Sequence, residues 1–456
     1  MTVAADAEEI AQLQAVEAEL DKRQPETVIE PSLVRIAALV DLLGSPQATY
    51  PVLGISGTNG KTSTARMLDA LLTRIGLRVG RYTSPHLQRV TERISIDSGP
   101  ISPASYVDAY TEIAPYVSLV DDGADVAMSK FEVLTGMAFA AFADAPVEAA
   151  VLEVGLGGRW DATNIADAQV ALVGPVSVDH IEHLGSDVAT IASEKAGIIK
   201  PGSVAVLAEQ QPEVARAIAE RCLEVDATVA REGMEFGVLD RDIAVGGQQL
   251  RLQGLGGVYE DVFLPLHGSH QARNAAAALA GAEAFFGAGP DHRLDVEAVR
   301  EAFAGVTAPG RLERVRTAPS VFLDAAHNPH GARALATALR EEFTFRRVVV
   351  VLSAMRDKDV RGILAELEPV ADEIVVTRNS SLRAMDLDEL AGHARQIFGE
   401  ERLRAEPRLD DAVEVAVAAA EEVATGDEPM SGGGVLITGS VVTAGEARTL
   451  FGRDPA

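Results

Sequence analysis

The sequence has 456 residues, of which 47% are hydrophobic, and it carries a formal net charge of −28 at pH 7. The length predicts two domains, and the acidic balance argues against nucleic acid or an anionic membrane as a partner, since phosphate contacts need clustered Lys and Arg. We expect a cytoplasmic protein for three reasons. Cys222 is the only cysteine, and the sequence starts with acidic residues and lacks a signal-peptide layout. No apolar run approaches the roughly 20 residues that span a bilayer.

The N-terminal part of the chain alternates helical and strand patterns. The patterns predict helices over residues 6–22, 31–43, 62–75, 187–196 and 270–286, and strands over 52–56, 147–154 and 170–176. The predicted strands are continuously apolar, which is typical of a parallel sheet that is covered on both faces.

The composition changes near residue 306, where a second alternating series begins. This series predicts strands over residues 321–323, 347–352, 373–377 and 435–438, and helices over 331–342, 359–370 and 411–423. Strands alternating with helices indicate a doubly wound α/β sheet. We therefore predict two α/β domains, residues 1–305 and 306–456.

A glycine-rich turn links the strand at 52–56 to the helix that follows it. It reads Gly57-Thr58-Asn59-Gly60-Lys61-Thr62-Ser63. Glycines let successive N–H groups face a phosphate, and the lysine can reach the β- and γ-phosphates. Because Ile55 replaces the first glycine of the strict motif, we interpret the segment as a variant P-loop. The alternative is a tight turn with an incidental lysine.

A second cluster of functional residues starts at Glu153, at the end of a predicted buried strand, and runs to Asn164. A buried carboxylate there needs a cation, and Mg²⁺ bound to nucleotide phosphates would supply one. A structural ion pair with Arg159 is the competing interpretation. The glycines of this segment do not fit a dinucleotide fingerprint, because Trp160 stands where its third glycine belongs.

Two further segments carry ionisable residues after predicted strands. Asp179-His180-Ile181-Glu182-His183 lacks the cysteine or third ligand that zinc would require, although His180 could serve Mg²⁺. Lys195 lies near a predicted helix C-terminus, where a favourable contact with the helix dipole is the simpler interpretation. In the second domain Asp324 could accept ribose hydroxyls or cap a helix. His327 could approach a reacting carboxylate, and Arg311 could reach a phosphate.

Taken together, these segments resemble the folylpolyglutamate synthase/dihydrofolate synthase family of the Mur ligase superfamily. The resemblance covers residues 28–451 and rests on the joint order of the motifs. They are Gly57–Ser63, Thr83–Leu87, Phe131–Thr135, Glu153–Asn164, Asp179–Lys200, His270–Asn274, Pro309–Glu313 and Asp324–Gly331. It implies a P-loop-containing Mur-ligase-like N-terminal domain and a smaller Rossmann-like α/β C-terminal domain.

The resemblance also implies a role for each matching residue. ATP contacts are implied for Thr58, Asn59, Gly60, Lys61, Thr62, Asn274, Arg311 and Asp324. Two Mg²⁺ ions are implied at Ser84, Glu153, His180 and Lys195, the lysine being carbamylated, which requires a neutral and desolvated amine. The pterin-bearing substrate is implied near Ile29, Glu30, Pro31, Ser129, Lys130, Phe131, Glu132, Trp160, Asp161 and Ala162, and the glutamate side near His327 and Ser440. The implied catalytic residues are Lys61, Lys195 and His327.

The implied activity is an ATP- and Mg²⁺-dependent ligation of L-glutamate to dihydropteroate, reduced folates or both, through an acyl phosphate. A monomer suffices, because one chain can form the cleft.

The sequence departs from the family pattern at two positions. Thr62 replaces a glycine that most family members carry, giving a form also seen in cell-wall Mur ligases, and Ala325 replaces another common glycine. A cell-wall amino-acid ligase, a P-loop nucleotide hydrolase and a non-catalytic binding module therefore remain as alternatives.

Overall fold

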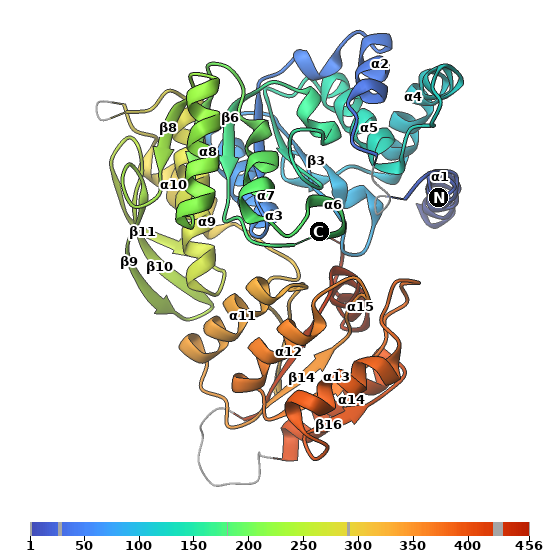
Figure 1. Ribbon diagram of the computed structural model, residues 1–456, viewed down its shortest axis with the longest axis vertical. Coiled ribbons are helices and arrows are strands. Elements are labelled where there is room, and N and C mark those ends of the chain that lie inside the picture. Colours follow the sequence, from blue (N-terminus) through green and yellow to red (C-terminus); the bar gives the residue numbers. More distant parts are fainter. Residues whose placement is uncertain (1, 26–29, 180, 290–291, 423–431, 456) are drawn as a thin grey trace.

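The computed structural model describes residues 2–25, 30–179, 181–289, 292–422 and 432–455. Figure 1 shows a blue-to-yellow part above an orange-to-red part, each built from strands with helices around them. Among the described residues, no helix combines the length and the apolar character that crossing a bilayer demands.

The first part is organised around an eight-stranded sheet with the order β4-β3-β2-β5-β1-β6-β7-β8. Its strands are β1 (Val52–Ser56), β2 (Val79–Tyr82), β3 (Ile94–Ile96), β4 (Gly99–Pro100), β5 (Ala149–Glu153), β6 (Ala168–Val173), β7 (Val204–Leu207) and β8 (Thr228–Arg231). Pairing is parallel from β2 to β8 and antiparallel at β3 and β4. The central strands β1 and β5 are buried at every position, as expected for a sheet covered on both faces.

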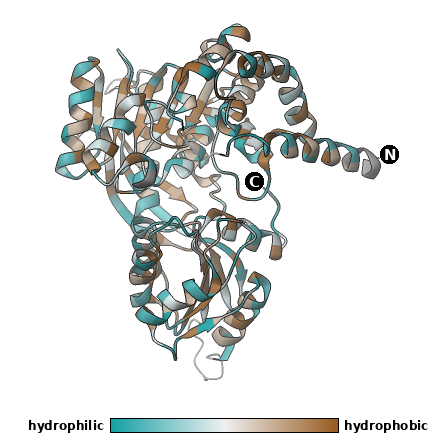
Figure 2. Cartoon of the chain, turned by 45° about the vertical axis from the view of Figure 1, so that its right-hand side comes forward, coloured by the Kyte–Doolittle hydropathy of each residue, from teal (hydrophilic) through white to brown (hydrophobic). Residues whose placement is uncertain are grey.

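Helices cover both faces of this sheet. They are α1 (Thr2–Leu20), α2 (Val34–Leu42), α3 (Lys61–Ile75), α4 (Pro103–Gly123), α5 (Lys130–Asp144), α6 (Ile181–Leu184), α7 (Val188–Lys195), α8 (Pro212–Glu224), α9 (Ser269–Phe285) and α10 (Val296–Ala304). One core joins α3, α9 and α10 to the sheet, and a second core on the opposite face joins α2, α4 and α5. Figure 2 shows α1 extending from the body, with the N-terminus at its far end.

A separate three-stranded antiparallel sheet packs onto α9 and α10. It consists of β9 (Gly237–Ala244), β10 (Gly247–Gln253) and β11 (Val258–Leu264), in the order β11-β10-β9. The sequence analysis did not predict this sheet.

The second part has a six-stranded sheet with the order β12-β13-β17-β14-β15-β16. Its strands are β12 (Glu313–Thr317), β13 (Ser320–Leu323), β14 (Val348–Leu352), β15 (Glu373–Val376), β16 (Leu403–Ala405) and β17 (Gly434–Thr438). Only β12 pairs antiparallel among them. The covering helices are α11 (Pro329–Glu342), α12 (Val360–Leu367), α13 (Leu387–Phe398), α14 (Leu409–Glu421) and α15 (Val441–Leu450).

The predicted fold class, α/β with central parallel sheets, is confirmed, and each predicted helix and strand has a counterpart that overlaps it. The antiparallel strands β3, β4 and β12 at the sheet edges were not predicted. The predicted domain boundary at residue 306 falls between the end of α10 at Ala304 and the start of β12 at Glu313.

Candidate active site

The P-loop lies where β1 ends and α3 begins. Gly60 is the N-cap of α3 and has a positive φ of 83°. Glycine at this position also lets α9 pack close to the P-loop, because a Cβ on residue 60 would lie 2.7 Å from Oδ1 of Asn274 in that helix. The Lys61 ammonium donates to the carbonyl oxygens of Gly57 (3.1 Å) and Thr58 (3.3 Å). Burial lowers the pKa of Lys61, and the nearby carboxylate of Glu153 opposes that shift.

Glu153 ends the strand next to the P-loop strand, with Ile55 as its partner in the register. The side chain is only 1% exposed, and its two oxygens accept from the Thr62 hydroxyl (2.9 Å) and from the Ser84 N–H (3.4 Å). Burial raises the pKa of Glu153, whereas the charge of Lys61 lowers it. The competing ion pair with Arg159 is not the arrangement found, since Glu153 turns to the P-loop instead.

Lys195 is the last residue of α7, but its side chain does not serve the helix end. The ammonium instead donates to the Gly57 carbonyl oxygen at 3.0 Å, so Lys195 and Lys61 share one acceptor. Lys195 is 5% exposed, and burial together with the neighbouring charge of Lys61 lowers its pKa to about 7. Half of this amine is therefore neutral near pH 7.

The predicted metal donors that the structure describes, Ser84, Glu153 and Lys195, converge on the P-loop. No group of three or more His, Cys, Asp and Glu side chains suited to a metal occurs within the described ranges. His180 lies outside the described residues. The buried carboxylate of Glu153, which accepts from the Thr62 hydroxyl and from the backbone N–H of Ser84, offers oxygen ligands of the kind that suit Mg²⁺ bound to a nucleotide.

Two predicted nucleotide contacts of the second part hold the backbone of the chain. Asp324 accepts from the N–H groups of Leu312 and Ala326, both at 2.8 Å, and burial raises its pKa. The suggestion that Asp324 caps a helix is wrong, because Asn328 is the N-cap of α11. The charge of Arg311 opposes this rise in the pKa of Asp324, and the Arg311 guanidinium donates to the Gly310 carbonyl oxygen at 3.1 Å.

His327 lies in the second part of the chain and approaches Asp179 of the first part. Its Nδ1 contacts the Ala325 carbonyl oxygen at 2.9 Å, and its Nε2 lies 3.8 Å from Asp179. A carbonyl only accepts, so Nδ1 carries the proton and Nε2 is left as an acceptor. Burial, with a contribution from Lys358, lowers the pKa of His327 to about 4, so the ring is neutral at pH 7.

Contacts between the two parts include residues that sequence reasoning missed. Asn59 and Asn328 exchange side-chain hydrogen bonds of 3.2 Å, and Asn328 also donates to Asp179 at 2.8 Å. Lys358 forms a 2.9 Å ion pair with Asp179, with both side chains less than 10% exposed. Lys358 follows β14, so the rule that ligands bind beyond the carboxyl ends of strands could have indicated it.

The predicted substrate-side residues fall into two neighbouring groups. The first group surrounds the glycine turn at 155–158. The Phe131 ring would lie 2.7 Å from a Cβ on Gly155, and the Trp160 ring lies beside Gly157. Asp161 there accepts from the N–H groups of Gly155 and Leu156 at 3.0 Å each, and the buried Ala162 follows it.

The second group on the substrate side is held together by Arg35. This guanidinium binds Glu132 (3.0 Å) and Glu30 (3.0 Å), and Glu132 forms a capping box with Ser129 at the start of α5. Pro31 is exposed, and Ile29 lies outside the described residues. Lys130 is directed away, to an ion pair with Asp21 of 2.5 Å.

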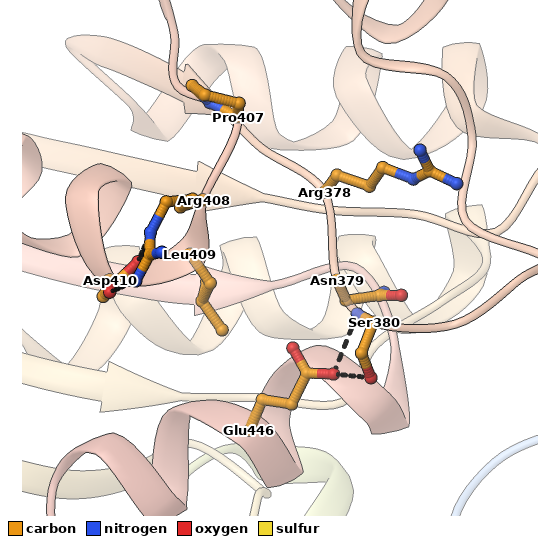
Figure 3. A pocket seen from close by; sticks show the side chains of 8 residues that line it. All are labelled: Arg378, Asn379, Ser380, Pro407, Arg408, Leu409, Asp410 and Glu446. Atoms are coloured by element: carbon orange, nitrogen blue, oxygen red, sulfur yellow. Dashed lines mark hydrogen bonds and ion pairs between the residues drawn. The ribbon is translucent and has the colours of Figure 1, made fainter.

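Two remaining predicted residues serve mainly local structure. Thr58 exchanges hydrogen bonds of 2.9 Å with the backbone of Ser177. Ser440 caps α15 and accepts from the amide of Asn379 at 3.1 Å. Asn379 also lines a polar hollow of about 400 Å³ beyond β15 and β16, where Glu446 accepts from Ser380, as Figure 3 shows.

Comparison with known proteins adds family matches to this geometry. Residues 126–282 match the Mur ligase middle domain, and residues 310–441 match the Mur ligase, glutamate ligase domain. The chain is 59% identical to the dihydrofolate synthase/folylpolyglutamate synthase of Mycobacterium tuberculosis, over 98% of this chain and 96% of that protein. It is 34% identical to the enzyme of the same name from Escherichia coli, over 80% of this chain and 82% of that protein.

Solved structures give the same picture. The Mycobacterium tuberculosis folylpolyglutamate synthase complexed with ADP superposes with a TM-score of 0.94 at 59% identity, covering 98% of this chain and all (100%) of that one. The Escherichia coli FolC in complex with DHPP and ADP has a TM-score of 0.83 at 30% identity, covering 96% and 97%.

Proposed function

The chain belongs to the folylpolyglutamate synthase/dihydrofolate synthase family of Mur ligases, and we propose that it adds L-glutamate both to dihydropteroate and to reduced folates, through an acyl phosphate. Membership makes it an ATP-dependent ligase of glutamate to folates, and it sets aside the cell-wall ligase and hydrolase alternatives. The proposal therefore concerns the range of substrates, the intermediate and the residues that act.

The observation that carries the proposal is the convergence of Lys61 and Lys195 on the Gly57 carbonyl oxygen, with the buried Glu153 carboxylate near enough for the charge of Lys61 to act on its pKa. A carboxylate is a poor electrophile and must be activated before an amine can attack it. We propose that the P-loop ammonium of Lys61 binds the γ-phosphate, in exchange for the neutral carbonyl oxygens of Gly57 and Thr58 that it contacts now.

We propose Mg²⁺ as the cofactor, in two sites to which Ser84, Glu153, His180 and a carbamylated Lys195 belong. Bound there, the ions would neutralise the charge that develops on the phosphates. Thr62 already orients the Glu153 carboxylate, and the lowered pKa of Lys195 supplies the neutral amine that carbamylation consumes.

We propose that the neutral ring of His327 accepts a hydrogen bond from the amine of glutamate and orients it, because a ring with a pKa of about 4 is too weak a base to take the proton itself. The amine of glutamate must lose a proton before or while it attacks the acyl phosphate. Since Nδ1 of His327 donates to the Ala325 carbonyl, the lone pair is on Nε2, which lies on the side of Asp179. Ser440, held by Asn379, is the proposed contact to the glutamate carboxylates.

We also propose a cytoplasmic monomer. The single cysteine fits a reducing compartment, and residues of one chain supply both sides of the cleft.

The test is ADP release with ATP, Mg²⁺ and L-glutamate, offering dihydropteroate or tetrahydrofolate in separate reactions and weighing the products by mass spectrometry. We expect one added glutamate in each reaction, and none with Lys61→Ala. Addition to only one substrate would limit the enzyme to half of the proposed range. ADP release with neither substrate, but with a uridine nucleotide sugar peptide, would contradict the proposal.

A further inference from the structure

The loop of residues 84–89, between β2 and the 3-10 helix η2 (Val90–Arg93), touches both parts of the molecule. At its start the Ser84 N–H donates to Glu153, beside the P-loop. At its other end Gln88 accepts from Arg448 of α15 at 2.8 Å and donates to the Thr449 hydroxyl of the same helix at 3.2 Å. One short loop therefore joins the P-loop side of the cleft to the C-terminal helix.

Close backbone packing strengthens the contact of this loop with α15. A Cβ at Gly445 would overlap the carbonyl oxygen of Leu87, so glycine lets the helix lie directly on the loop. The Leu87 side chain also lies 3.1 Å from where a Cβ of Gly310 would be, in the segment that links the two parts. Because α15 begins at its N-cap Ser440, the loop lies against the helix that presents the glutamate side.

The conformation of the loop is fixed by one carboxylate. Glu92 is only 4% exposed, and it accepts from the N–H groups of Leu87 (2.8 Å), Gln88 (3.2 Å) and Arg89 (3.1 Å). Hydrogen bonds to an ionised carboxylate are roughly twice as strong as neutral ones. The carboxylate thus holds three consecutive backbone amides of the segment that contacts α15.

We propose that Glu92 is a positioning residue for ligation, which keeps Ser84 and the Ser440 end of α15 at the separation that the reaction requires. It touches neither substrate, and it acts through the loop and α15. The inference rests on the proposed function, because it assigns Ser84 to the activated carboxylate and Ser440 to the attacking glutamate. Misplacement of the two sides by about 1 Å is enough to slow such a reaction by about a hundredfold.

The chain offers a matched control for removal of this carboxylate. Glu283 is also fully buried, and it accepts from the N–H groups of Leu255 and Gly256 and from the Tyr259 hydroxyl (2.8 Å). These contacts tie α9 to the three-stranded sheet, not to the 84–89 loop. Glu283→Gln therefore tests the general cost of losing a buried carboxylate that holds the backbone.

The experiment compares Glu92→Gln, Glu283→Gln and the wild-type chain in three measurements: steady-state kinetics, ADP affinity by calorimetry, and hydrogen exchange of the 84–89 amides. For Glu92→Gln we expect faster exchange of the Leu87 to Arg89 amides, an ADP affinity within about twofold of wild type, and kcat lowered by about tenfold or more. Gly445→Ala, which pushes the loop off α15 from the other side, should lower kcat in the same way. Glu283→Gln should keep the wild-type kcat.

Two results would overturn the inference. One is wild-type kcat in Glu92→Gln despite fast exchange in the loop. The other is an equal loss of kcat in Glu283→Gln, which would reduce Glu92 to a general stabilising role. Failure of the proposed function is separate, because it would appear as absent ligation in the wild-type chain itself.

Discussion

The amine of Lys195 gives the sharpest test of the proposed chemistry. Its pKa is lowered to about 7, by burial first and by the charge of Lys61 second. At pH 7.5 an amine with that pKa is about 75% neutral, whereas an ordinary lysine is about 0.1% neutral. Because only the neutral amine attacks CO₂, the reactive fraction of Lys195 at pH 7.5 is several hundred times that of an exposed lysine, which favours carbamylation at this residue.

To measure this, CO₂ is first removed from the enzyme and ¹³CO₂ is then added at a fixed concentration. The carbamate is followed by ¹³C NMR, and the recovery of ligation activity is followed in parallel. We expect the rate of carbamate formation to rise with pH around a midpoint of about 7 and to level off above it. Lys195→Arg should give neither signal nor activity, and short carboxylic acids should partly restore Lys195→Ala. A rate that still climbs toward pH 10, or full activity of unsupplemented Lys195→Ala, would refute the reasoning.

Three further substitutions test other contacts. Lys61→Ala should abolish turnover in a folded chain, and ADP-release rates near wild type would contradict the P-loop assignment. Asn379→Ala removes the 3.1 Å donor to Ser440 and should raise KM for glutamate by about tenfold while KM for ATP stays unchanged. Glu342→Ala leaves Arg241 without its buried partner and should lower the free energy of unfolding in urea by about 3 kcal/mol. An unchanged midpoint of the urea transition would contradict this.

The sequence predicted the elements whose patterns are local and strong. Strands β1, β5 and β13 are continuous apolar runs, and the residues that follow or end them, Gly57, Glu153 and Asp324, could be placed at the carboxyl edge of a sheet for that reason. Strand β9 lacks such a pattern. Leu239 (48% exposed) and Ile243 (51%) are exposed, as are Asp240 and Asp242, so neither an apolar run nor a clean alternation marks it.

The sequence could place those site residues that lie at the end of a strand or the start of a helix. It could not predict which residue each of them contacts. Lys358 and Asp179 are 179 positions apart, and their ion pair follows only from how the two sheets face each other. Conversely, Asp161 was assigned to substrate, yet its carboxylate accepts from the Thr163 N–H at 3.0 Å, a local turn that the Asp-Ala-Thr sequence could have indicated.

The net charge of −28 raises the question of how the chain attracts ATP, a folate and glutamate, which are all anions. Long-range attraction cannot be the source, since the protein field repels them. The ammonium of Lys61 instead donates to the neutral carbonyl oxygens of Gly57 and Thr58. Hydrogen bonds from an ammonium to phosphate or carboxylate are stronger than those to a carbonyl oxygen, so a bound anion can replace the carbonyl as the acceptor. Affinity for these anions is therefore local, which reconciles anionic substrates with the strongly negative net charge of the chain.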